Sequence, residues 1–163
     1  IQELNADNLE MFFTDEVVLV EGVSDKLLIR GLIDKFYKGD KDIKVIQAHG
    51  KGNINIYADL LKIFKIPFTV VLDRDAIKSN HLRSSLRHLE IHMPPMNNEE
   101  LLEQLKQYSI FILPNGDLEA NYPRKYQVGD SKSLNALHAA NLISEKDFNS
   151  KVMVNLKSII NNL

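Results

Sequence analysis

The chain has 163 residues, of which 44% are hydrophobic and none is cysteine, and its formal net charge at pH 7 is −2. This length predicts one domain with a core of its own, and the lack of cysteine excludes disulfides and thiolate metal sites and favours a cytoplasmic protein. The apolar runs are far shorter than the roughly 20 residues of a membrane span, and no signal peptide opens the sequence.

The first half of the chain alternates predicted strands with predicted helices. Short runs rich in β-branched residues are typical of strands buried on both faces, and apolar residues at helical spacing indicate the helices, the first capped by Ser24. This alternation predicts right-handed βαβ units and a mostly parallel sheet. In chain order we expect a lead-in at 4–13 packed on the sheet, strand 17–20, helix 24–37, strand 43–48, helix 56–64 and strand 68–72.

The second half departs from this rhythm. A polar, basic and partly helical insertion comes first, and the C-terminal part reads as two helices divided near Ser144, where Ser-Glu-Lys-Asp resembles a capping box. We therefore predict an α/β, Rossmann-like fold with a central, mostly parallel four-stranded sheet flanked by helices, followed by a helical C-terminal part. The predicted ranges are insertion 76–96, helix 99–108, strand 109–113 and C-terminal helices 132–163, with the core at 14–122 of a single domain, 1–163.

Carboxylates follow three of the four strands. Ligands of parallel sheets bind beyond the carboxyl ends of the strands, so we expect these acids to meet in one crevice. Residues two apart in extended chain point the same way, so Asp73 and Asp75 can face one ion. Crowded carboxylates need counter-charge, and Mg²⁺ or Mn²⁺ is the natural partner of oxygen ligands. The predicted metal ligands are Glu21, Asp25, Asp73, Asp75, Asp117 and Glu119.

Each of these acids also has a plainer interpretation. A single acid after a strand is often a helix cap or a solvated loop residue, and Asp25 fits a first-turn acid favoured by the helix dipole. Asp117 also fits a simple turn residue after Gly116. Acids at three strand ends together favour the metal site.

The charge distribution permits a nucleic-acid partner. Setting the six acids aside leaves 16 acidic against 20 basic residues, a balance of +4. Lys51, between two glycines, could contact a phosphate or simply occupy a flexible turn, and the basic insertion could follow a DNA backbone, form a solvated helix surface or contact another domain. The five histidines are not spaced as a metal site. The basic residues of the insertion are His81, Arg83, Arg87, His88 and His92, with the two arginines on one helix face.

The order of these motifs resembles a known family. Val-Glu-Gly-x-Ser-Asp after the first strand, a Gly-rich turn after the second and Leu-Asp-x-Asp after the third resemble the Toprim domain of topoisomerases, primases and nucleases. The segments 4–13, 18–25 and 116–119 are similar to the nucleases of the OLD (overcoming lysogenization defect) family, and the resemblance runs to Glu119 or Lys132. It implies that carboxylates matching Glu21, Asp25, Asp73, Asp75 and Glu119 hold two metal ions, and that a downstream lysine assists the chemistry.

Lys132, directly before a predicted helix, is our candidate for this lysine, with Lys125 and Lys151 as alternatives. The resemblance implies an Mg²⁺- or Mn²⁺-dependent endonuclease or nickase that hydrolyses DNA phosphodiester bonds with two ions. Its catalytic residues would be Glu21, Asp73, Asp75 and Lys132, with Glu21 as a ligand or as a general acid or base. A role in phage defence or DNA repair would follow from the family.

The family's N-terminal ABC-type ATPase is missing from this sequence, which has no Gly-x-x-x-x-Gly-Lys-Ser/Thr motif. Together with the opening Ile1 in place of methionine, this predicts a piece of a longer protein, whose ATPase domain would be a partner, the source of any ATP dependence and a route to a homodimer. Two alternatives stay open: another Toprim enzyme, such as a topoisomerase or primase fragment, and a receiver-like metal-binding signalling module. Asp-x-Glu after the fourth strand favours two metals over the receiver's single phosphoacceptor aspartate.

Overall fold

The computed structural model describes residues 6–163, without the side chains of residues 6, 7, 51 and 81. Leu4 and Asn5 of the expected lead-in therefore lie outside the described residues, as do the expected phosphate contact of Lys51 and the side chain of His81. No helix in the described part of the chain is long and apolar enough to cross a membrane. The α-helices are α1 (Ala6–Leu9), α2 (Val23–Phe36), α3 (Ile54–Ile63), α4 (Asn80–His88), α5 (Asn98–Lys106), α6 (Lys132–Leu142), α7 (Glu145–Phe148) and α8 (Val154–Asn161).

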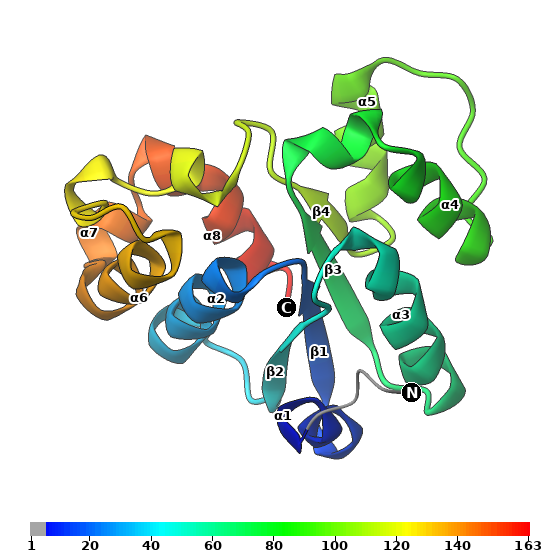
Figure 1. The fold of residues 1–163 in the computed structure, drawn as a ribbon, viewed down its shortest axis with the longest axis horizontal. Coiled ribbons are helices and arrows are strands. Elements are labelled where there is room, and N and C mark those ends of the chain that lie inside the picture. The colour runs from blue at the N-terminus through cyan, green and yellow to red at the C-terminus, as the bar shows by residue number, and fades with distance from the viewer. Residues whose placement is uncertain (1–5) are drawn as a thin grey trace.

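A four-stranded parallel sheet lies at the centre, with the strand order β2-β1-β3-β4 (Figure 1). In β1, Val18 lies opposite Val45 of β2 and Thr69 of β3, and the short β4 extends the sheet beside β3. The predicted α/β fold with a parallel sheet is confirmed. The strands are β1 (Glu16–Val20), β2 (Ile43–Gln47), β3 (Phe68–Leu72) and β4 (Ile110–Ile112).

The continuous apolar run of β1 is buried because helices cover both faces of the sheet. Val18 and Val20 pack with residues of α2, α6 and α8, whereas Val17 and Leu19 pack with residues of α3, α4 and α5. Figure 1 shows these two groups of helices on opposite sides of the sheet. Side chains alternate along a strand, so a strand covered on both faces has no polar side to reveal it as amphipathic.

Two helix starts were predicted from capping residues, with different outcomes. Ser24 is not the N-cap of α2; Gly22 is, and the Asp25 carboxylate accepts a hydrogen bond from the Gly22 amide at 2.9 Å. Ser144 is the N-cap of α7, where its hydroxyl accepts from the Asp147 amide and the Asp147 carboxylate accepts from the Ser144 amide, each at 3.2 Å. The predicted capping box is therefore confirmed. The C-terminal part contains three α-helices rather than two, because the chain turns at Lys151–Met153 before α8.

The close packing of α2 on α6 depends on Gly31. A Cβ atom built on Gly31 would lie 2.5 Å from the Cβ and 3.1 Å from the Cα of Ala140. The two helices can therefore approach this closely only where one of them lacks a side chain. This contact fixes α6, whose first residue is Lys132, beside the start of α2.

Candidate active site

A cavity of about 260 Å³ opens at the carboxyl edge of the sheet. Its walls come from the start of α2, the ends of β3 and β4, and the first residue of α6. Four of the six predicted metal ligands and the predicted lysine line it, as expected for acids that follow parallel strands. The lining residues are Gly22, Val23, Ser24, Asp25, Asp73, Asp117, Leu118, Glu119 and Lys132.

Lys132 is paired with the carboxylates that follow β4. Its Nζ lies 2.8 Å from Asp117 Oδ2 and 3.3 Å from Glu119 Oε2. The hydrogen bond to Asp117 is the main cause that raises the pKa of Lys132, and the same bond lowers the pKa of Asp117. The ammonium therefore stays charged in the cavity at physiological pH.

The alternative lysines lie elsewhere. Lys125 forms an ion pair with Asp147 at 2.6 Å, and Lys151 is exposed in the turn Lys151–Met153; neither is among the residues that line the cavity. Lys132 is thus the candidate that the fold brings to the carboxylates.

The negative charges of two lining carboxylates, Glu119 and Asp25, are only partly balanced by hydrogen bonds and nearby cations. Glu119 is 18% exposed, and its Oε1 is buried without a hydrogen-bond partner. Burial is the main cause that raises the pKa of Asp25, and the negative charge of Glu119 raises it further. Burial, together with Glu119 and Asp117, also raises the pKa of the nearby Tyr122 to about 12. An additional cation is the partner that this local excess of negative charge favours.

Two of the six predicted ligands, Glu21 and Asp75, lie near the carboxyl edge of the sheet but do not line the cavity. The Asp73 amide donates a hydrogen bond to Glu21 Oε1 at 3.3 Å, which holds the Glu21 side chain at the end of β3. Asp75 is exposed and lies in a 3-10 helix, Arg74–Lys78, of which Asp73 is the N-cap. The expectation that the chain is extended from Asp73 to Asp75 is wrong, since the backbone turns directly after Asp73, and the prediction that both carboxylates face one ion stays a prediction. Neither Glu21 nor Asp75 is among the residues that line the cavity.

The segment after β4 turns in the same way. Asp117 is the N-cap of a 3-10 helix, Leu118–Asn121, yet Asp117 and Glu119 still meet on Lys132. In the part of the chain that the structure describes, no group of three or more acidic or histidine side chains is arranged closely enough to hold a metal ion. The ligand and catalytic roles of the six acids and of Lys132 stay predictions.

The basic insertion lies apart from this cavity. Arg83 and Arg87 are exposed on α4 and line a separate hollow of about 580 Å³ whose walls are mostly apolar. His88 contacts Asp59 of α3, with 2.5 Å between Nε2 and Oδ1, so this histidine makes an intramolecular contact. Sequence reasoning considered His81, His88 and His92 as part of the basic insertion and found no metal-site spacing among the five histidines, but it did not single out His49. This residue follows β2 at the carboxyl edge, and its signal was the His-Gly pair directly after a strand.

Comparison with known proteins finds similarity to OLD proteins in sequence and in fold. Residues 12–75 match the family model of the overcoming lysogenization defect protein-like TOPRIM domain. Over these residues the chain is similar to OLD-like Toprim domains. It is 25% identical over 134 residues to endonuclease GajA of Bacillus cereus (strain HuB5-5), a match that covers 72% of this chain and only 19% of that protein.

Solved structures show the same fold. The C-terminal region of the Xanthomonas campestris pv. campestris OLD protein superposes with a TM-score of 0.66 at 18% identity, covering 93% of this chain and 95% of that one. The C-terminal region of the Burkholderia pseudomallei OLD protein gives a TM-score of 0.62 at 16% identity, covering 91% and 98%. The fold of these C-terminal regions thus extends over nearly the whole chain, including the C-terminal helices beyond the segment matched by the family model.

Proposed function

We propose that this Toprim domain hydrolyses DNA phosphodiester bonds as the Mg²⁺- or Mn²⁺-dependent endonuclease or nickase unit of an OLD-like protein. The observation that carries the proposal is the cavity that Asp25, Asp73, Asp117 and Glu119 line together with Lys132. The similarity to a protein named as an endonuclease supports the same reaction. An ATPase domain, a homodimer, a cytoplasmic location and a role in phage defence or DNA repair would be properties of the longer protein.

The donor chemistry of the cavity suits divalent cations. The donors are carboxylate oxygens, which Mg²⁺ and Mn²⁺ prefer, and Glu119 Oε1 is a buried oxygen without a partner. Burial, with a smaller contribution from the charge of Glu119, raises the pKa of Asp25, and a bound cation would offset both effects. Asp25, Asp73, Asp117 and Glu119 would be ligands, with Glu21 and Asp75 joining from the ends of β1 and β3. When bound, two ions supply the Lewis-acid charge that polarises the phosphodiester and activates water.

The chain's own residues then have separate tasks. Lys132 neutralises Asp117 and Glu119, and its half-exposed ammonium can turn toward a phosphate once those carboxylates have another partner. There it would stabilise the negative charge that grows on the phosphate oxygens in the transition state. Glu21, held by the Asp73 amide, would be a ligand or would exchange a proton with the attacking water or the leaving oxygen.

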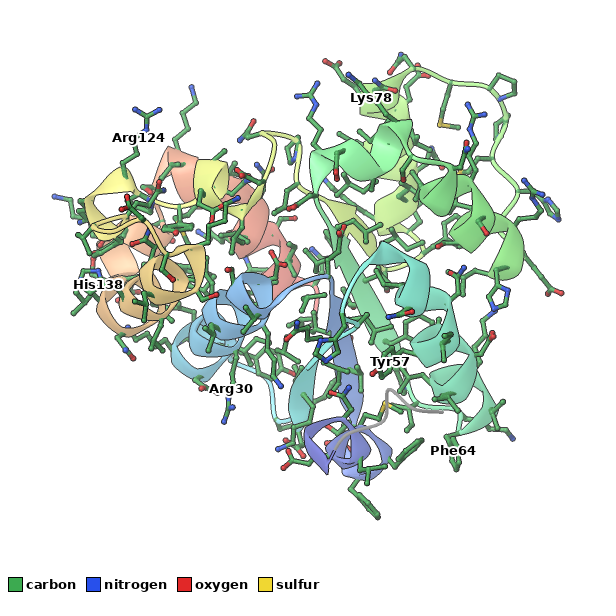
Figure 2. All side chains as sticks on the ribbon, in the orientation of Figure 1. Arg30, Tyr57, Phe64, Lys78, Arg124 and His138 are labelled. Atoms are coloured by element: carbon green, nitrogen blue, oxygen red, sulfur yellow. The ribbon has the colours of Figure 1, made fainter. Side chains whose placement is uncertain are left out.

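Cations on both sides of the carboxyl edge support a DNA substrate. Figure 2 shows Lys78 on the α4–α5 side of the sheet and Arg124 on the α6–α8 side, both at the edge of the molecule toward which the strands run. A DNA strand that crosses the cavity could meet both side chains. Such phosphate contacts position the substrate without reading its sequence.

The test is cleavage of supercoiled plasmid by the 163-residue chain without ATP. Nicking or linearisation with Mn²⁺ or Mg²⁺, abolished by EDTA and by Glu119→Gln, is expected. Glu119→Gln is nearly isosteric and removes one carboxylate charge from the cavity. A folded chain that binds no Mn²⁺ and leaves plasmid intact over a wide range of enzyme concentration would overturn the proposal. Incubation with acetyl phosphate and Mg²⁺ tests the receiver-like alternative, which requires a phosphorylated aspartate.

A further inference from the structure

His49 occupies an unusual backbone position at the carboxyl edge. Four residues other than glycine have positive φ angles in the described chain: His49 at 56°, Lys65 at 56°, Glu90 at 60° and Ser109 at 57°. The last three directly follow α3, α4 and α5, where left-handed residues commonly end helices. His49 instead follows β2, in a conformation that favours glycine.

The loop around His49 is fixed to the strand that ends in Glu21. The Ala48 amide donates to the Val20 carbonyl at 2.9 Å, and the Gly50 amide donates to the Glu21 carbonyl at 3.2 Å. The Asn53 side chain also donates to the His49 carbonyl at 3.4 Å. Both neighbours of His49 in the chain are therefore hydrogen-bonded to the end of β1. The second of these bonds is to Glu21, which directly precedes Gly22 of the cavity wall.

The His49 imidazole contacts the side chain of Gln47, with 3.2 Å between Gln47 Nε2 and His49 Nδ1. The amide nitrogen can donate to Nδ1, an arrangement that leaves Nε2 to carry a ring proton. The side chain is exposed, and Nε2 has no hydrogen-bond partner among the described residues. The loop that is hydrogen-bonded to the end of β1 thus presents an exposed imidazole whose Nε2 can donate to a ligand.

We propose that His49 is a substrate-binding residue of the Toprim site, which donates its Nε2–H to a phosphate oxygen of the nucleic-acid strand beside the scissile bond. This inference rests on the proposed nuclease function. The phosphate backbone offers anionic oxygens that accept from neutral donors, and a donor fixed beside Glu21 would set the register of the strand over the cavity. Such a contact forms on binding and persists through the reaction, so it affects KM more than kcat.

The exchange His49→Gly separates this role from a purely structural one. Glycine adopts a φ of 56° without strain, so the variant should melt no lower than the wild type. Its KM for supercoiled plasmid in Mn²⁺ should rise about tenfold, as expected for losing one hydrogen bond to a charged group, with kcat little changed. Affinity for a fluorescein-labelled DNA duplex in Ca²⁺ should fall by a similar factor. Ser109→Gly, at a φ of 57° before β4, is the matched control and should leave both values unchanged.

The variants His49→Gln and His49→Gly should rank in opposite order of DNA affinity depending on whether His49 binds DNA or only forms the turn. The glutamine amide can take the place of Nε2 as a donor, so it should recover part of the lost affinity although it tolerates a positive φ less well than glycine. If His49 only forms the turn, His49→Gly will bind and cut like the wild type and His49→Gln will be worse, which overturns the inference. A wild-type chain that binds the duplex but never cuts it overturns the nuclease function instead. In that case the duplex affinity of His49→Gly relative to wild type still tests whether His49 contacts DNA.

Discussion

Lys132 is the only cation among the described residues that line the cavity, so Lys132→Ala removes one charge from four carboxylates. Its side chain is 62% exposed, and ion pairs at such positions contribute at most about 1 kcal/mol to stability. For a chain of this size that corresponds to roughly 2–4 °C in Tm. A lysine that stabilises the transition state should cost about a hundredfold in rate, or about 2.7 kcal/mol, when removed. The catalytic effect should therefore clearly exceed the structural one.

The assay is single-turnover cleavage of one supercoiled plasmid at saturating Mn²⁺ and saturating DNA. Lys125→Ala is the matched control, because Lys125 is also paired with a carboxylate but lies outside the cavity. Lys151→Ala tests the third candidate. We expect only Lys132→Ala to lose about a hundredfold in rate, with Mn²⁺ affinity unchanged or tighter because Asp117 and Glu119 lose a competing cation. Wild-type cleavage by Lys132→Ala, with a large loss in either other variant, would refute the assignment.

Three further predictions address the metal site, the fold and pH. Asp73→Ala should abolish cleavage without lowering the metal-free Tm, because removing one of several crowded carboxylates relieves repulsion; retained activity with a large fall in Tm would make it structural. Gly31→Ala should destabilise the chain by about 1–3 kcal/mol in urea unfolding because its Cβ meets α6, whereas Gly52→Ala, with open space around it, should not; equal stability would contradict this packing. The pKa of Asp147 is held below 3.8 in the folded chain, chiefly by Lys125, so its charge stabilises the fold above pH 3.8, and this contribution is lost as the pH falls through the lower folded value. The Tm difference between wild type and Asp147→Asn should therefore be largest near neutral pH and shrink below pH 3.8, and a difference independent of pH would count against the ion pair.

The amino-acid sequence alone determined the elements whose signals are local. The run Phe68–Leu72 was predicted with the bounds that the structure gives to β3, and Val17–Val20 with one residue fewer than β1. Buried parallel strands require continuous β-branched and apolar residues, which can be read directly from the chain. The Ser144 capping box was predictable for the same reason, because both of its hydrogen bonds join residues three apart. That acids gather at one edge also follows from strand order and direction.

Only the tertiary structure decided which side chains share the cavity. The direction of Asp75 depends on the turn after Asp73, where the Ala76 amide bonds back to the Asp73 carbonyl, and no spacing rule for extended chain anticipates that turn. The choice of Lys132 over Lys125 depends on where α6 lies, and α6 is positioned by the contact of Ala140 with Gly31, 109 residues away. Contacts between residues so far apart arise from how the helices pack on the sheet. The sequence therefore predicted a carboxylate site with Lys132 as the candidate lysine, and the packing of α6 on α2 brings that lysine to the carboxylates.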